Sequence, residues 1–204
     1  WVTFGATGVA HGVAVDSNGI AYITGEYQGS VSFGGDTLPG SLSSWSIYLV
    51  KLSAMGQHVW SHGYTGNNFG QQVAVDVENN VLLTGKFTSV DFGLGTMTSP
   101  SSGSVFVAKF YTLGECTWQK QFGGNGSSGM GIATDASRNV LVTGTCYGTT
   151  NFGGGAVTGL NDYCAFILKL DSSGNHVWSR GTGAFLGNKY GGNSIAVAPN
   201  GDPF

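Results

Sequence analysis

The sequence predicts an all-β fold, a β-propeller built from four-stranded antiparallel blades. Three observations lead to this prediction: an internal repeat of about 59 residues, a composition of 36 glycines with only 9% charged residues, and four short apolar runs in each repeat. Repeated four-strand units are typical of propellers, because one small twisted sheet cannot bury both faces and must stack against its neighbours. No segment shows the periodicity of a helix.

Four tryptophans define the repeat. They fall 59, 58 and 60 residues apart, and the other landmarks keep step with them: Trp1, Trp60, Trp118 and Trp178. The predicted repeats are residues 1–59, 60–117, 118–177 and an incomplete 178–204, so residues 1–204 form one partial propeller of about three and a half blades. A β-sandwich and a β-helix are minor alternatives, since a sandwich needs no such unit and a β-helix usually has shorter coils.

The first two strands of each blade are predicted from two apolar runs. The first run ends in aspartate, at residues 12–16, 72–76 and 131–135. We expect this aspartate to cap the turn that follows by accepting hydrogen bonds from it. A role as a calcium ligand is less well supported, because calcium needs more oxygen ligands than this turn offers. The second run ends in a glycine nine residues beyond the aspartate: Gly25, Gly85 and Gly144.

The third and fourth strands are predicted after a longer loop that carries Phe-Gly. The third run ends in lysine, and the fourth carries the repeated tryptophan. The lysines are Lys51, Lys109 and Lys169. They alternate with apolar neighbours, so each amine is expected to face away from part of the core, with an ion pair to the aspartate of the same blade as an option. The tryptophan ring is expected to lie between adjacent sheets on the outer strand.

Charge and hydropathy exclude several partners. The formal net charge is −3 and no lysine or arginine cluster occurs, which predicts neither a nucleic acid partner nor binding to an anionic membrane. The longest apolar runs are too short to span a bilayer, so no membrane insertion is expected. The chain begins at Trp1 and breaks off in the first strand of another blade. The remaining blades of a longer polypeptide, or a second copy, are therefore expected to close the ring.

Two of the three cysteines are placed to form a hairpin cross-link. Cys146 and Cys164 flank one loop between predicted neighbouring strands, where a disulfide could form, and Cys116 would then be left over. The alternative is three ordinary half-buried thiols. A disulfide would indicate an oxidising compartment.

The second and third repeats share the pattern Asp-x-x-x-Asn-Val-Leu-x-Thr-Gly, with Phe-Gly, Phe-Val-Ala-Lys and Gly-x-x-x-Trp around it. Over its whole length the chain resembles the secreted bacterial β-propeller repeat (SBBP-type) family. This resemblance implies an extracellular or cell-surface propeller, commonly part of a longer protein, with no shared catalytic residues. The first repeat departs from the pattern at Ile20 and the fourth at Ala198, so neither residue type is expected to be indispensable to every blade.

Candidate ligand-binding residues vary at equivalent places near one mouth of the predicted channel. They stand immediately before the innermost strand of each repeat: His11, Gln71, Met130 and Asn193. Such variation builds an asymmetric site on a repeated scaffold, although unconstrained loops vary in the same way. Asn67 lies in a loop that combines aromatic residues with asparagine and glycine, a mixture that suits sugar binding and also tight turns.

No metal or cofactor is predicted. The four histidines lack metal-ligand spacing, and no nucleophile-elbow or paired-cysteine motif is present. Residues 124–129 match the dinucleotide fingerprint Gly-x-Gly-x-x-Gly by accident, because a strand follows them rather than a helix that could bind phosphate.

The sequence therefore predicts a non-catalytic extracellular or cell-surface propeller that acts as a binding or structural module, as part of a larger surface assembly. Carbohydrate or protein is the expected ligand. The alternative is an enzyme of hydrolase or lyase type, with its site at the propeller mouth and some of its residues outside this chain. The lack of a non-repeated acid, base or metal cluster favours the binding module.

Overall fold

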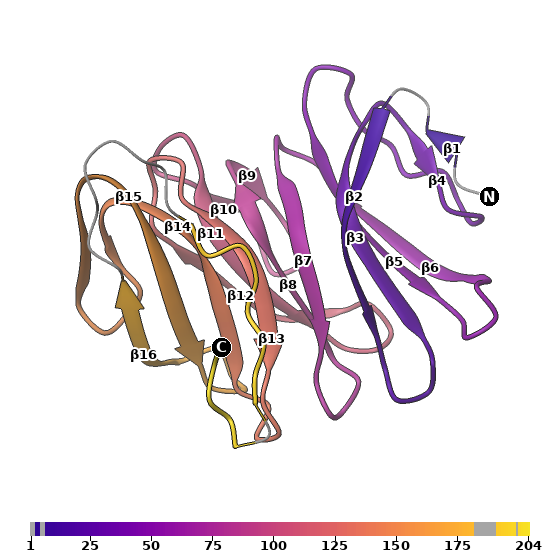
Figure 1. Ribbon diagram of the computed structural model, residues 1–204. Coiled ribbons are helices and arrows are strands. Elements are labelled where there is room, and N and C mark those ends of the chain that lie inside the picture. The colour runs from indigo at the N-terminus through magenta and orange to yellow at the C-terminus, as the bar shows by residue number, and fades with distance from the viewer. Residues whose placement is uncertain (1–2, 5–6, 182–190, 199) are drawn as a thin grey trace.

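The computed structural model describes residues 3–4, 7–181, 191–198 and 200–204, and the regular structure in them is entirely β-strand (Figure 1). Three antiparallel sheets of four strands contain most of it. This confirms the predicted all-β class with four-stranded antiparallel sheets. Two smaller sheets pair β1 (Thr3–Phe4) with β4 (Val31–Ser32) and β9 (Ser89–Val90) with β10 (Met97–Thr98). No helix that could cross a membrane occurs in the described part of the chain.

The three larger sheets follow one another along the chain. Sheet 1 has the strand order β2-β3-β5-β6, sheet 2 the order β7-β8-β11-β12 and sheet 3 the order β13-β14-β15-β16. Each sheet thus places its first strand at one edge and its tryptophan-bearing strand at the other. The strand bounds are β2 (Thr7–Val15), β3 (Ala21–Gln28), β5 (Ser46–Leu52), β6 (His58–Tyr64), β7 (Phe69–Val75), β8 (Val81–Phe87), β11 (Ser104–Phe110), β12 (Cys116–Phe122), β13 (Ser128–Thr134), β14 (Val140–Asn151), β15 (Ala156–Leu170) and β16 (His176–Gly181).

The turn after each first strand is capped by the aspartate, as the sequence predicts. In sheet 2 the Oδ1 atom of Asp76 accepts hydrogen bonds from the backbone N–H groups of Glu78 and Asn80, both at 2.9 Å. The intervening Asn79 has a φ of 63°, which asparagine tolerates better than most residues. The same pair of hydrogen bonds caps the turns of the other two sheets, at Asp16 and Asp135.

The third-strand lysines do not all lie as the sequence predicts. Lys109 does not face away from the core: only 8% of its side chain is exposed, and its Nζ lies 2.9 Å from Oδ2 of the fully buried Asp76 side chain. Lys169 and Asp135 form an equivalent pair, also at 2.9 Å. Lys51 instead donates to a backbone carbonyl in the turn between β11 and β12 at 2.8 Å. A buried carboxylate requires a nearby positive charge, and this requirement draws Lys109 inward.

The sheets pack face to face with their first strands together. Strand β7 contacts both β2 and β13, and Figure 1 shows the three strands running side by side. One apolar cluster joins sheets 1 and 2, and another joins sheets 2 and 3. At the outer edge the indole N–H of Trp60 donates to the carbonyl oxygen of Thr112 in sheet 2, and that of Trp118 to Ser172 in sheet 3, both at 3.1 Å. Each outer strand is therefore tied to the next sheet.

The outer face of sheet 1 lacks a neighbouring sheet among the described residues. Val13 on β2 is 63% exposed, whereas Val73, at the equivalent position on β7, is 3% exposed because it packs between sheets 1 and 2. The difference comes from the presence or absence of a neighbouring sheet, since both valines occupy the same position in the repeat.

The described residues 191–198 repeat the start of another unit. The N–H of Gly192 donates to the carbonyl oxygen of Gly144 at 3.2 Å, and the backbone at Ser194 lies closely against Gly131 of β13. The backbone of Gln72 lies against Gly12 of β2 in the same way. Residues 191–195 therefore occupy the place beside sheet 3 that β7 occupies beside sheet 1.

Cys146 and Cys164 form a disulfide in the structure. They are directly opposite each other on the neighbouring strands β14 and β15, and both are buried. Cys116 is a free thiol at the start of β12.

Candidate functional site

Each first strand contains a β-bulge at the same place. The strand pairings shift register around one extra residue in each sheet: His11 in β2, Gln71 in β7 and Met130 in β13. The sequence placed these residues just before the strand, but each strand begins two to four residues before its bulge residue, because the glycine-rich segment also pairs with the second strand. A bulge re-aims its extra side chain, so three non-equivalent side chains leave the three sheets at equivalent points.

A second set of non-equivalent residues lies beside the bulges, on the second strands. Each follows the repeated glycine directly: Glu26 on β3, Lys86 on β8 and Thr145 on β14. Together the two sets give sheet 1 a histidine and a carboxylate, sheet 2 an amide and an ammonium, and sheet 3 a thioether and a hydroxyl. The repeated backbone thus presents different chemistry in each sheet.

The side chains of His11 and Glu26 form a hydrogen-bonded pair in sheet 1. The Nε2 atom of His11 lies 2.8 Å from Oε1 and 2.7 Å from Oε2 of Glu26, whose side chain is 10% exposed. Burial raises the pKa of Glu26, and the hydrogen bond and the charge of His11 partly oppose this effect. The pair therefore holds the imidazole in one orientation at the bulge.

Lys86 lies at the corresponding place in sheet 2. Its aliphatic stem packs against Gly103, and its Nζ approaches Gly126 of the loop between β12 and β13. The hydroxyl groups of Ser102 and Tyr163 approach the same glycine. Among the described residues no carboxylate forms a salt bridge with Lys86.

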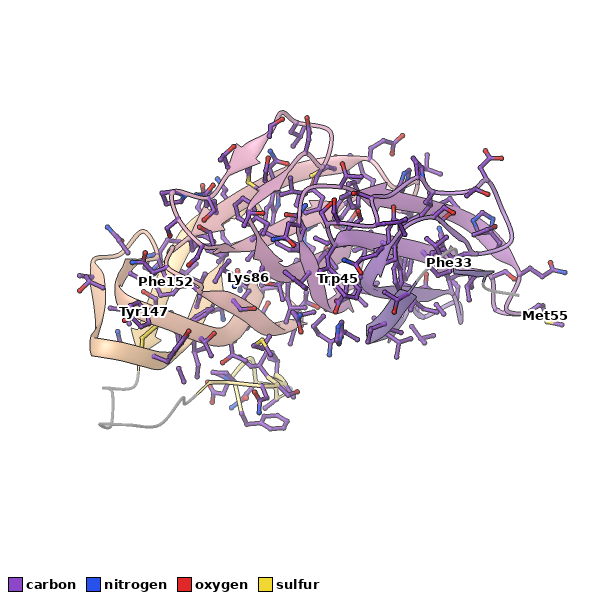
Figure 2. All side chains as sticks on the ribbon, turned by 90° about the horizontal axis from the view of Figure 1, so that it is seen from above. Phe33, Trp45, Met55, Lys86, Tyr147 and Phe152 are labelled. Atoms are coloured by element: carbon purple, nitrogen blue, oxygen red, sulfur yellow. A yellow bond between two sulfur atoms is a disulfide. The ribbon has the colours of Figure 1, made fainter. Side chains whose placement is uncertain are left out.

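Aromatic side chains stand at the same end of the sheets. Trp45, directly before β5, contacts the ring of Phe69 on β7, with 6.3 Å between ring centroids. In sheet 3 Tyr147 and Tyr163 form an edge-to-face pair at 5.2 Å. Figure 2 looks onto this end, where Trp45, Lys86 and Tyr147 follow one another across the three sheets. We call this the inner-end surface: His11, Glu26, Trp45, Gln71, Lys86, Met130, Thr145 and Tyr147.

Two residues of this region differ from the sequence prediction. Trp45 was not predicted as a site residue, and Asn67 was predicted although the adjacent Asn68 is the asparagine that holds the loop. Of the five tryptophans Trp45 alone falls outside the 59-residue period, and that irregularity could have drawn attention to it. Asn67 is exposed, with a φ of 61°, at the loop before β7. The adjacent Asn68 is buried and holds that loop by donating to the carbonyl oxygens of Thr65 and Ser89.

The remaining sequence candidate, Asn193, is exposed within residues 191–198. It occupies the equivalent place in the segment beside sheet 3, so the structure aligns it with His11, Gln71 and Met130. In the described part of the chain, no group of three or more histidine, cysteine, aspartate or glutamate side chains is placed to hold a metal ion.

Substitution of the glycine opposite the bulge is expected to destabilise the fold and displace the site. A Cβ on Gly85 would clash with the carbonyl oxygen of Phe69 and lie 2.9 Å from the ring of Phe106. We expect Gly85→Ala to lower the free energy of unfolding by about 1–3 kcal/mol, as overpacking does. Lys86→Ala, the adjacent half-exposed position, should change it by about 0.5 kcal/mol or less. Urea denaturation measures both, and equal midpoints would show that the glycine is not needed.

Comparison with known proteins gives one informative relative. No protein-family model matches the chain. An uncharacterized WD repeat-containing protein of Acanthamoeba polyphaga mimivirus is 25% identical to it, in a match that covers 65% of this chain. The chain spans only 12% of the length of that protein. Together with the three repeated sheets, this similarity supports a β-repeat protein.

Proposed function

We propose that the three four-stranded sheets are blades of a β-propeller of the SBBP type. The shared strand order, the adjacent first strands and the tryptophan contacts between outer edges support this proposal. The WD repeat-containing relative supports the propeller architecture, since WD repeats are propeller units, but it does not bear on the SBBP type. The proposed blades share the period of the sequence repeats, but each blade ends with the tryptophan strand at which a sequence repeat begins. Residues 191–198 would start a fourth blade.

Further blades of the same polypeptide would cover the exposed face of β2, as sheet 1 covers the equivalent face of β7. The mass of the natural protein and its size in solution test this. A mass well above the 21.0 kDa of the chain, with a size to match, is the expected result. A 21.0 kDa protein that forms a dimer would mean that two copies close the ring, and a 21.0 kDa monomer would contradict a closed propeller.

The function that the geometry supports best is non-catalytic binding of carbohydrate at the inner-end surface. The observation that carries this proposal is the bulge, which presents a different side chain at the same point of each sheet. Around the bulges stand an aromatic face at Trp45, the Tyr147–Tyr163 pair and charged or polar groups. Aromatic rings that pack against sugar faces, beside groups that hydrogen-bond hydroxyls, suit a carbohydrate better than a flat protein surface.

A non-catalytic role also fits the way in which most ionisable side chains inside the sheets are paired with one another. Asp76, Asp135, Lys109 and Lys169 are paired with one another inside the sheets, and Glu26 is paired with His11. An extracellular or cell-surface location is part of the proposal, because the Cys146–Cys164 disulfide persists best in an oxidising compartment.

A screen of oligosaccharides against the 204-residue chain tests the binding proposal. For a sugar that binds, we expect Trp45→Ala to raise the Kd by about tenfold, because the variant loses roughly one contact between an aromatic ring and the sugar. Tyr111→Ala is the matched control, since Tyr111 is an exposed aromatic residue after β11, outside the inner-end surface. Isothermal titration calorimetry gives each Kd.

Three outcomes would contradict the proposal. Equal weakening by Trp45→Ala and Tyr111→Ala would show that the inner-end surface is not the site. Absence of binding across the screen would remove carbohydrate as the ligand and favour protein. Release of cleaved products would support the hydrolase or lyase alternative instead.

A further inference from the structure

One position at the inner end of the third strand differs among the sheets. It directly precedes the residue that pairs with the second strand two positions beyond the repeated glycine. The residue there is Trp45 in sheet 1 and Tyr163 in sheet 3, but Gly103 in sheet 2. The aliphatic stem of Lys86 packs over Gly103. Where the other two sheets have an aromatic residue, sheet 2 therefore presents the ammonium group of a lysine.

The loops that lead into sheets 2 and 3 have the same local conformation. Two successive residues of each loop have a positive φ: Gly66 and Asn67 before β7, Asn125 and Gly126 before β13. The side chain of the next residue, Asn68 or Ser127, donates to the carbonyl oxygen three residues earlier in both loops. Gly126 thus takes the place of the exposed Asn67 and leaves its side-chain position open.

Three polar groups from different segments surround this open position. A Cβ built on Gly126 would lie 3.7 Å from Oγ of Ser102 and 3.9 Å from Nζ of Lys86. It would lie 4.0 Å from the hydroxyl oxygen of Tyr163. Apart from chain neighbours, these are the nearest atoms to that point in the described part of the chain. All three groups can donate a hydrogen bond, and the lysine also carries a positive charge.

These distances fit an oxyanion whose central atom lies at the open position. In a carboxylate, a C–O bond of about 1.2 Å is followed by a charge-assisted hydrogen bond of about 2.7–2.9 Å, bent at the oxygen. The donor then lies roughly 3.5–4 Å from the carboxylate carbon. A sulfate group has a similar size and the same acceptor chemistry, so the site suits either group.

The equivalent positions of the other sheets do not offer this charge. Glu26, the counterpart of Lys86 in sheet 1, is itself a carboxylate and is hydrogen-bonded to His11. The counterpart in sheet 3 is the neutral Thr145. The salt bridges among the described residues do not involve Lys86. The oxyanion site is therefore particular to the junction between sheets 2 and 3.

We propose that Lys86, Ser102 and Tyr163 bind an oxyanion, and that the saccharide at the inner-end surface is an acidic one with a carboxylate or sulfate group. This inference rests on the proposed carbohydrate function. The ring of Tyr163 also forms the edge-to-face pair with Tyr147, so the aromatic pair and the oxyanion site share one residue. Hydrogen bonds to charged groups are about twice as strong as neutral ones, so this site selects acidic over neutral saccharides.

Titration of the 204-residue chain with sodium sulfate and with sodium acetate, at low and constant ionic strength, tests the oxyanion site without a sugar. Protein NMR shifts of residues 101–103 and 125–127 report binding. We expect a Kd on the order of 10 mM for sulfate, because so small an ion makes few contacts. Lys86→Met keeps the stem and should raise this Kd about tenfold, whereas Lys86→Arg should stay within about threefold.

Two further variants separate shape from net charge. Gly126→Asn fills the open position with the residue that the loop before sheet 2 carries, so it should fold and raise the sulfate Kd about fivefold. Lys120→Met is the matched control, because it removes one positive charge from the outer strand β12, near Gly174, and should leave the Kd unchanged. The urea midpoint of each variant shows that it is folded.

Pairs of oligosaccharides identify the acidic group. One pair is a uronic acid oligosaccharide and its neutral methyl ester, and the other is a sulfated oligosaccharide and its unsulfated counterpart. In isothermal titration calorimetry we expect the acidic member to bind about tenfold more tightly, and this preference to vanish in Lys86→Met. A preference in the first pair alone would identify a carboxylate, and in the second pair alone a sulfate.

Unchanged sulfate and acetate affinity in Lys86→Met would overturn the oxyanion site, as would absence of shifts at residues 101–103 and 125–127 in the unmodified chain. Equal binding of acidic and neutral saccharides would overturn the acidic preference but leave the carbohydrate function intact. Lys86-dependent sulfate binding without binding of any saccharide would support the oxyanion site, and would overturn the carbohydrate function and the acidic saccharide with it.

Discussion

Lys109→Ala is expected to lower the free energy of unfolding by about 3–5 kcal/mol, the usual cost of leaving a buried charge without its partner. The partner is Asp76, whose side chain is fully buried 2.9 Å from Nζ of Lys109. Asn80 would remain as a hydrogen-bond donor to the same carboxylate, but a neutral amide does not replace a cation. Urea denaturation at pH 7 measures the change.

The matched control is Lys51→Ala. Lys51 is the equivalent lysine of sheet 1, but it donates to a backbone carbonyl rather than to a carboxylate. Its loss should cost about 1 kcal/mol, the net value of an ordinary hydrogen bond. Equal effects at the two positions would show that the buried ion pair in sheet 2 is no stronger than a neutral contact.

The effect of Lys109→Ala should also depend on pH. Burial raises the pKa of Asp76, but hydrogen bonds from Lys109 and Asn80 and the Lys109 charge outweigh burial, so the pKa is lowered overall. A lowered carboxyl pKa stabilises the fold above the unfolded value of about 3.9, and this contribution is lost as pH falls through the folded value. The difference in stability between the unmodified chain and the variant should therefore be full at pH 7 and shrink as pH falls toward the lowered folded pKa of Asp76, because the carboxyl becomes protonated and no longer needs a cation. A difference that stays constant down to pH 2 would contradict this account.

Removal of the disulfide is expected to lower the free energy of unfolding by about 3 kcal/mol, because the bond closes a loop of 18 residues and restricts the unfolded chain. Cys146→Ala with Cys164→Ala is the suitable variant, since both positions are buried and alanine adds no polar group. Urea denaturation without reductant should show the loss. The unmodified chain unfolded in reductant should show a similar one.

Cys116→Ser provides the control for the disulfide. This half-buried residue is a free thiol, so its loss should cost about 1 kcal/mol or less, with no dependence on reductant. Equal stability of the double-alanine variant and the unmodified chain under oxidising conditions would contradict a stabilising cross-link.

Much of the fold could be predicted from sequence because the relevant signals are local. Alternating apolar residues, the aspartates at the first turns and the glycines after the second runs each act within a few residues, and the 59-residue period repeats them. The strands and their antiparallel order within each sheet follow from these signals. The first strands were placed too short, because their glycine-rich beginnings carry no apolar alternation, although they pair in the sheet.

The candidate site could be predicted only in part. His11, Gln71 and Met130 stood out as differences at one place in the repeat, but nothing local showed that each is the extra residue of a bulge. Glu26 was missed because its hydrogen bond with His11 joins residues 15 positions apart on different strands. Trp45 was missed because it lies outside the repeat, and its contact with Phe69 exists only where sheets 1 and 2 meet.

The sequence by itself determined the all-β class, the repeat and the four-strand unit, since these depend on backbone preferences over short stretches. It left open whether Cys146 and Cys164 were bonded. Only the tertiary structure decided that Lys109 turns inward to Asp76 and that the bulges carry unlike side chains to one end. These features depend on distances between residues far apart in the chain, and packing of one sheet on the next sets those distances.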